Sequence, residues 1–125
     1  MIEQMQNGRL YLNDAITENS NIPWNPHQTF KGVYLKHLVT SAQTNGKFSA
    51  HLVKVEPGCI LDNHIHEGKT EMHEVVKGSG MLTLENKAYA YAPGDLAIIP
   101  ENAMHKVVAG DSGLYLLAKF VPALI

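Results

Sequence analysis

From residue 31 onward, short runs of alternating hydrophobic and polar residues predict β-strands, and no run has a convincing helical period. Residues typical of turns, chiefly glycine, proline and asparagine, separate these runs. The predicted strands cover residues 32–40, 47–56, 59–66, 71–77, 81–84, 88–91, 96–99, 106–109 and 114–121, with turns at 78–80 and 110–113. About eight to nine short strands at this spacing predict an all-β sandwich or barrel.

Residues 1–30 have a less regular pattern. Leu10 to Leu12 form a candidate first strand, and Ile22 to Pro26 form an extended segment that two prolines stiffen. We therefore expect a helix-free arm at residues 1–30 and a single β-domain at residues 31–125. The carboxyl end, Val121 to Ile125, is apolar, and a homodimer that uses the arm and this end would cover it.

Two histidines separated by a single residue provide the strongest chemical signal. His64 and His66 lie on the same face of a strand, because strand side chains alternate with a period of two. The loop at residues 67–70 is long enough for Glu71 to begin the next strand and face them. Imidazole nitrogens and a carboxylate oxygen suit first-row divalent ions, whereas the single cysteine, Cys59, cannot build a thiolate site.

The spacing around these residues resembles the two signatures of the cupin superfamily. The first signature is complete, with its anchors at Gly58, His64, His66, Glu71 and Gly78. The second is similar to the stretch from Gly94 to Pro100, followed by His105 at the position of the fourth ligand. Two anchors depart from the pattern, since Asn102 replaces a glycine and Ala109 replaces an asparagine. Asparagine is the residue that best replaces glycine at positive φ, so we expect the turn to survive.

This resemblance covers roughly residues 48–121 and implies a double-stranded β-helix, the jelly-roll barrel of cupins. It also implies that His64, His66, Glu71 and His105 hold one divalent transition metal ion, with manganese, iron, nickel and zinc all compatible. Three imidazoles and one carboxylate would leave two adjacent octahedral positions for water, substrate or O₂.

Other polar residues are candidates for supporting roles. His73 shares strand parity with Glu71, so it points inward, either to assist proton transfer or as a hydrogen-bonded core histidine. His51 is also predicted to point inward, because the residues that alternate with it are charged, and we consider it a second catalytic candidate. The carboxylate of Asp62 is positioned either to hydrogen-bond a ligand imidazole or to occupy a strand edge. His27 is interpreted as an ordinary surface residue.

Charge and composition exclude several classes of partner. A net charge of −2 and the absence of a basic run argue against nucleic-acid binding. No apolar segment approaches the ~20 residues that span a bilayer, so we expect no membrane partner. The first residues do not resemble a signal peptide, and one cysteine fits a reducing compartment, so we expect a cytoplasmic protein.

Two functions remain open from the sequence. The first is a metal-dependent enzyme that acts on a small oxygenated molecule, with dioxygenase (oxidoreductase), isomerase or lyase chemistry allowed by the resemblance. The alternative is a non-catalytic module that binds or senses a small molecule such as a sugar or an organic acid. The fold does not choose between these functions.

Overall fold

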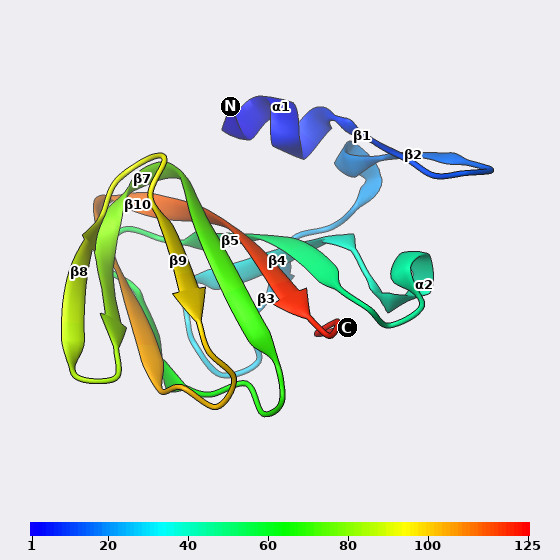
Figure 1. The fold of residues 1–125 in the computed structure, drawn as a ribbon. Coiled ribbons are helices and arrows are strands. Elements are labelled where there is room, and N and C mark those ends of the chain that lie inside the picture. The colour runs from blue at the N-terminus through cyan, green and yellow to red at the C-terminus, as the bar shows by residue number, and fades with distance from the viewer.

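Eight strands, β3 to β10, form the sheet of the barrel, and the segment with α1, β1 and β2 lies outside it (Figure 1). The computed structural model describes all 125 residues. The elements are α1 (Ile2–Asn7), β1 (Arg9–Tyr11), β2 (Ile16–Glu18), η1 (Asn19–Asn21), β3 (Asn25–Pro26), β4 (Val33–Val39), α2 (Ser41–Thr44), β5 (Ser49–Val55), β6 (Ile60–His64), β7 (Thr70–Leu84), β8 (Lys87–Tyr91), β9 (Leu96–Ile99) and β10 (His105–Val121). None of the helices is long and apolar enough to cross a membrane.

Two long strands, β7 and β10, pair with each other and connect the remaining strands of the barrel. The first part of β7 pairs with β9 and its last part with β8, while the first part of β10 pairs with β6 and its last part with β5. The prediction of separate strands with turns at 78–80 and 110–113 is therefore wrong. These glycine-rich stretches lie opposite each other, where the β7–β10 register shifts. A side chain at Gly78 (φ 87°) would collide with the carbonyl oxygen of Gly113, so this close approach requires glycine.

The hydrophobic core lies on the inward faces of the strands. On β5, His51, Val53 and Val55 are almost fully buried, as predicted, but Leu52, which was expected to face solvent, is fully buried as well. Leu116 and Phe120 of β10 are also buried, and the cluster extends to other strands of the barrel. All predicted strands other than the merged ones match β4, β5, β6, β8 and β9 to within a few residues.

The amino-terminal segment contains a helix, which corrects the expectation of a helix-free arm. In α1, Ile2 is buried, and the Gln6 carbonyl oxygen accepts a hydrogen bond of 3.3 Å from Lys36 Nζ on β4. Leu52, which is paired with Lys36, is fully buried on the outer face of β5. The short α1 therefore lies against the outside of the barrel, where this contact compensates for its low intrinsic stability. Arg9–Tyr11 is a strand, as expected, and it pairs with β2.

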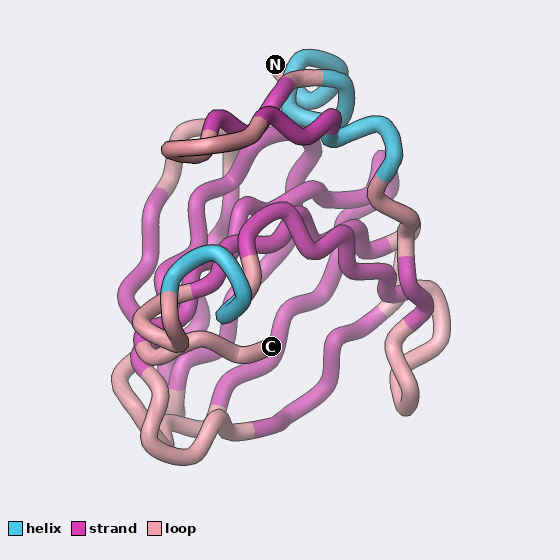
Figure 2. Tube along the Cα trace, turned by 90° about the vertical axis from the view of Figure 1, so that its right-hand side faces the viewer, coloured by secondary structure: helices cyan, strands magenta, loops and turns pink.

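The carboxyl end is bound to its own barrel rather than extended into solvent. The backbone N–H of Leu124 donates to Ser49 Oγ at 2.8 Å, and the carbonyl of Ile125 accepts from Ser41 N–H at 2.7 Å. Figure 2 shows the carboxyl terminus beside α2. The Val121 and Ile125 side chains remain exposed, but Leu124 is half-buried and packs against the core.

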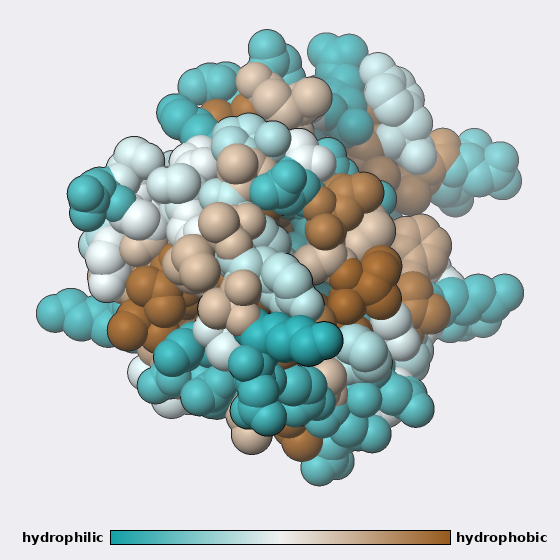
Figure 3. Space-filling model, turned by 60° about the vertical axis from the view of Figure 1, so that its left-hand side comes forward, coloured by the Kyte–Doolittle hydropathy of each residue, from teal (hydrophilic) through white to brown (hydrophobic).

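Exposed hydrophobic side chains gather on part of the surface. Leu96 and Ile98 of the edge strand β9 are 62% and 59% exposed, and Tyr89 of β8 is 47% exposed. Figure 3 shows apolar patches between hydrophilic regions on the face seen there. Patches of this kind are typical of surfaces that contact another molecule.

Candidate metal centre

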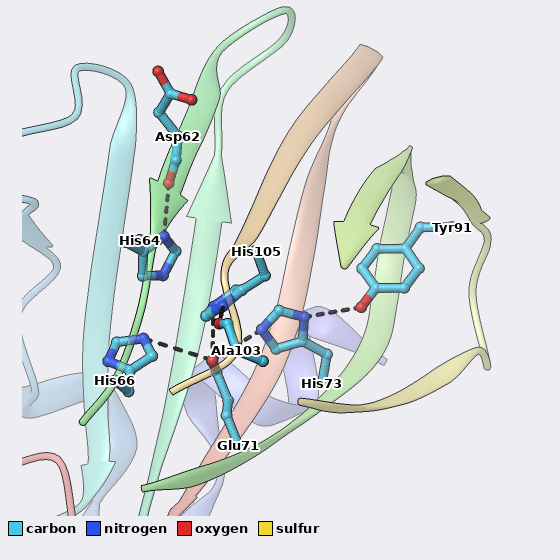
Figure 4. Close-up of polar contacts among 8 residues, drawn as sticks. All are labelled: Asp62, His64, His66, Glu71, His73, Tyr91, Ala103 and His105. Carbon is cyan, nitrogen blue, oxygen red and sulfur yellow. Dashed lines mark hydrogen bonds and ion pairs between the residues drawn. The ribbon is translucent and has the colours of Figure 1, made fainter. Parts of the chain in front are cut away.

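His64, His66 and His105 point toward one another inside the barrel (Figure 4). His64 is the last residue of β6, His66 follows two residues later, and His105 begins β10, where it pairs with His64. One ring nitrogen from each histidine lies within 4.8 Å of the other two, an arrangement that can hold a metal ion. The pairing of β6 with β10 therefore brings together residues that are about forty positions apart in the sequence.

Backbone carbonyl groups fix the orientation of two of these rings. His64 Nδ1 lies 2.7 Å from the Asp62 carbonyl oxygen, and His105 Nδ1 lies 3.0 Å from that of Ala103. A carbonyl only accepts, so each Nδ1 carries a proton, and in the neutral form of each ring Nε2 is the nitrogen with the lone pair. The Asp62 side chain accepts from Asn63 N–H, which favours the strand-edge role among the two considered for this carboxylate over the one that orients an imidazole.

Glu71 stands beside the three histidines with one oxygen free. Its Oε1 lies 3.2 Å from His105 Nε2 and 3.6 Å from His66 Nε2. Both Glu71 Oε1 and His105 Nε2 are buried and lack a hydrogen-bond partner. A shared cation would satisfy both atoms, because each offers a lone pair and an unpaired buried polar atom is costly. The donor set of three nitrogens and one oxygen therefore fits a divalent transition metal.

The electrostatics of the site favour positive charge next to this carboxylate. Burial alone would raise the pKa of Glu71, but the neighbouring His73 and His105 hold it below its usual value. Burial lowers the pKa of His64 to about 4 and also lowers that of His66, so both rings are neutral at pH 7. The pKa of His105 is instead raised, because its contacts with Glu71 and the Ala103 carbonyl outweigh burial, so metal binding would displace a proton shared between His105 and Glu71.

A chain of hydrogen bonds through His73 and Tyr91 holds the other carboxylate oxygen of Glu71, Oε2. His73 Nε2 lies 2.9 Å from Glu71 Oε2, and His73 Nδ1 lies 2.9 Å from the Tyr91 hydroxyl (Figure 4). The carboxylate only accepts, so His73 Nε2–H donates to it and Tyr91 O–H donates to Nδ1. This chain fixes the carboxylate with Oε1 turned toward the histidines.

His51 belongs to a different network. Its Nδ1 lies 2.8 Å from Nδ1 of His37, its partner across the β4–β5 pair, and its Nε2 lies 2.8 Å from Ser49 Oγ. Ser49 in turn holds the carboxyl-terminal segment through Leu124 N–H. Burial and the nearby His37 lower the pKa of His51 to about 4. The structure thus connects His51 to the tail rather than to the three histidines.

A cavity of about 160 Å³ adjoins the clustered histidines. Its walls are His27, Val33, Leu35, Val53, Leu61, His64, His66, Glu71, Phe120 and Leu124. Neither predicted catalytic residue, His73 or His51, lines this cavity, so direct contact of either with a substrate is not supported. Three larger hollows contain none of the clustered histidines: two, of about 370 and 460 Å³, lie beside β8, and one, of about 340 Å³, shares His27, Leu35 and Leu124 with this cavity.

Sequence reasoning missed two residues of this cavity. His27 was expected on the surface, but its ring stacks on Phe30 and forms part of the wall. Leu124 was expected at a dimer contact, but it closes another part of the wall. No local pattern marks either residue, because both reach the cavity through irregular segments at the two ends of the chain.

The turn that carries a departure from the cupin pattern is intact. Asn102 adopts φ 67°, the left-handed conformation expected for the residue that replaces glycine. Its backbone N–H donates to the His66 carbonyl at 3.2 Å, and its side-chain oxygen accepts from Gly68 N–H at 3.2 Å. Asn102 therefore also braces the loop that follows His66.

Several proteins of known structure have a fold similar to that of this chain. KdgF from a Halomonas species has a similar structure, with a TM-score of 0.72 and 25% identity over 83% of this chain and 91% of that chain. A predicted oxalate decarboxylase from Thermotoga maritima has a TM-score of 0.75 at 23% identity, covering 82% and 95% of the two chains. An RmlC-like cupin from Shewanella frigidimarina has a TM-score of 0.73 at 18% identity, covering 86% and 90%. No curated protein sequence matches this one.

The sequence also matches a family described as the cupin domain. The match runs over residues 51–118, more than half of the chain, and includes all three clustered histidines. The jelly-roll topology of the barrel agrees with that match. The chain therefore belongs to the cupin family.

Proposed function

We propose that this cupin is a metal-dependent enzyme whose single divalent ion is held by His64, His66, Glu71 and His105. The observation that carries the proposal is the pair of buried, unpartnered atoms, Glu71 Oε1 and His105 Nε2, which lie 3.2 Å apart. The fixed Nδ1–H donors of His64 and His105 support it, because they leave each Nε2 available as a ligand. Manganese, iron, nickel and zinc remain compatible with this donor set.

A metal ion at this position would supply Lewis acidity, or an O₂ site if it is redox-active, to a small oxygenated substrate in the adjoining cavity. The surrounding residues have separate tasks. His73 and Tyr91 hold the Glu71 carboxylate in place through their chain of hydrogen bonds. Phe120 and Leu124 exclude water from the cavity. His73 thus acts as a positioning residue, and His51 positions the tail.

One observation favours the alternative of a non-catalytic binding module. Among the residues that line the cavity, only His27 is a titratable group outside the proposed ligand set. A binding protein needs no base, so a sugar or organic acid sensor would tolerate this scarcity. For the enzyme, the structural neighbour described as a predicted oxalate decarboxylase suggests a decarboxylation as the first reaction to test.

A turnover screen tests the proposal. The protein would be loaded separately with Mn²⁺, Fe²⁺, Ni²⁺ and Zn²⁺ and incubated, with and without O₂, with diketones, hydroxy acids and sugar acids. We expect turnover of one class, lost in His105→Ala and kept in Met104→Ala, whose exposed side chain is the neighbouring control. Full metal occupancy with ligand binding but no turnover would favour the binding module instead.

We also propose that the protein forms a homodimer in the cytoplasm and has a small molecule, rather than nucleic acid or membrane, as its ligand. The exposed apolar residues Leu96, Ile98, Val121 and Ile125 support the dimer, because a stable interface would bury them. The net charge of −2 supports the absence of nucleic-acid binding.

A further inference from the structure

We infer that the cavity selects a small chelating monoanion with an apolar body, such as a branched 2-oxo acid, over dianions and polyhydroxylated acids. This inference rests on the proposed function, because the chelating head would bind the metal held by the three histidines and Glu71. It goes further in naming which substrates the remaining walls accept. Three features of those walls carry it: their apolar surface, their charge and their single hydrogen-bond donor.

The first feature is the apolar surface opposite the histidines. Six of the lining residues, namely Val33, Leu35, Val53, Leu61, Phe120 and Leu124, have hydrocarbon side chains. A hydroxyl or carboxyl group placed against these side chains would lose its water without gaining a partner. The volume of about 160 Å³ is roughly half of the ~300 Å³ at the lower end of pockets for drug-sized ligands. The ligand body must therefore be both short and apolar.

The second feature is charge. Glu71 is the only charged side chain in the lining, and no lysine or arginine joins it. Lys69, which lies near His66, is committed to the Ala123 carbonyl oxygen at 2.8 Å. The only arginine, Arg9, is paired with Glu18 in the amino-terminal segment. A second carboxylate on the ligand would therefore lie in an apolar pocket without a counter-ion, which strongly disfavours it.

The third feature is His27, the only polar side chain of the lining outside the proposed ligand set. Its Nδ1 accepts hydrogen bonds from Thr29 N–H at 3.0 Å and Phe30 N–H at 3.2 Å. The proton of the neutral ring must then be on Nε2, which is free to donate one hydrogen bond. His27 also lines the neighbouring hollow of about 340 Å³, so it offers this cavity at most one donor in addition to the metal, which is too few for several hydroxyl groups.

Leu124 determines how far the ligand body extends. The tail that carries it is fixed by Leu124 N–H to Ser49 Oγ at 2.8 Å and by Ala123 N–H to the Gly46 carbonyl at 3.1 Å. Because the backbone is held at these points, the Leu124 side chain is a fixed part of the wall. A change at this residue therefore alters the end of the cavity without touching any proposed metal ligand.

Calorimetry on the full-length protein loaded with Mn²⁺, under anaerobic conditions, tests the inference. The probes are 4-methyl-2-oxopentanoate, 2-oxoglutarate and pyruvate, which share one chelating head and differ in having an apolar body, a second carboxylate or no body. Gluconate represents the polyhydroxylated acids. We expect 4-methyl-2-oxopentanoate to bind at least ten-fold more tightly than each of the other three. Equal or tighter binding of 2-oxoglutarate or gluconate would overturn the inference.

A positive charge introduced into the cavity wall at residue 124 should change the preference between the probes, and the same charge outside the cavity is the control. Leu124→Lys is expected to reduce the preference for 4-methyl-2-oxopentanoate over 2-oxoglutarate by ten-fold or more. Val121→Lys, which adds the same charge at an exposed tail position outside the lining, should leave the preference unchanged. Should Leu124→Lys fail to fold by circular dichroism, the wild-type series still decides the question.

The outcomes separate this inference from the proposed function. Wild-type protein that binds no Mn²⁺ by elemental analysis overturns both. Stoichiometric Mn²⁺ with no binding of any 2-oxo acid, or with a preference for the dianion, overturns the substrate class and leaves the metal site standing.

Discussion

Acidification should destabilise the metal-free protein through His51. Burial and the nearby His37 lower the pKa of His51 from 6.5 to about 4 in the folded state. The unfolded chain therefore binds a proton on this residue at a higher pH than the folded chain does. The contribution of His51 to stability is fully present above pH 6.5 and is lost as the pH falls toward about 4.

The size of the effect follows from the pKa shift. One pKa unit corresponds to about 1.4 kcal/mol, so the complete effect of the His51 shift is about 3 kcal/mol. Between pH 7 and pH 5 the linkage relation gives a loss of about 2 kcal/mol from this residue. The ring is fully buried and bonded to Ser49 and His37, so solvent provides little relief for the charged form.

Urea unfolding with a metal chelator at pH 5, 6 and 7 would measure this loss in the wild type and in His51→Gln. Other buried histidines, including His64, titrate in the same range, so the comparison between the two proteins isolates His51. Glutamine retains a polar group for Ser49 but does not titrate. The variant should lose about 2 kcal/mol less than the wild type between pH 7 and pH 5. An identical loss in both proteins would refute the assigned role of His51.

Three further changes have expected outcomes. Gly78→Ala should lower the free energy of unfolding by about 3 kcal/mol, because the added methyl group meets Gly113 at a residue with positive φ. Gly46→Ala, which has open space at a similar φ, should lower it by only about 1 kcal/mol in the same thermal unfolding experiment. Equal losses in the two variants would contradict the close approach of Gly78 to Gly113. His73→Gln should keep the metal and reduce turnover by about ten-fold or more, because it loosens Glu71, and unaltered kinetics would show that this contact is not needed. Sedimentation should give a dimer at micromolar concentration, and a monomer would exclude the proposed assembly.

The sequence predicted the barrel well because its signals are local. The period of two predicted that His64 and His66 lie together, and they do, although β6 ends at His64 and His66 follows outside the strand. On β5 the same alternation predicted the burial of His51 but not that of Leu52. The left-handed conformation of Asn102 was predicted from the resemblance to cupins, in which glycine stands at this position, together with the tolerance of asparagine for positive φ. The pairing of His64 with His105, by contrast, was reached through the resemblance to cupins, because no local rule gives a contact across β6 and β10.

The errors came from contacts between distant segments. Gly78 was interpreted as a chain reversal, although its conformation bends a continuous strand against Gly113. His27 and Leu124 reach the cavity from irregular segments that have no periodic pattern. The supporting group of His64 is a backbone carbonyl at Asp62, which residue type cannot reveal.

Elemental analysis of the purified protein and its variants tests the metal site most directly. The wild type should contain one divalent transition metal ion per chain, and His64→Ala, His66→Ala, Glu71→Ala and His105→Ala should each lose it. Asp62→Ala should keep the metal, because only its backbone carbonyl contacts His64. Stoichiometric metal in all four ligand variants would contradict the assignment of these residues to the site.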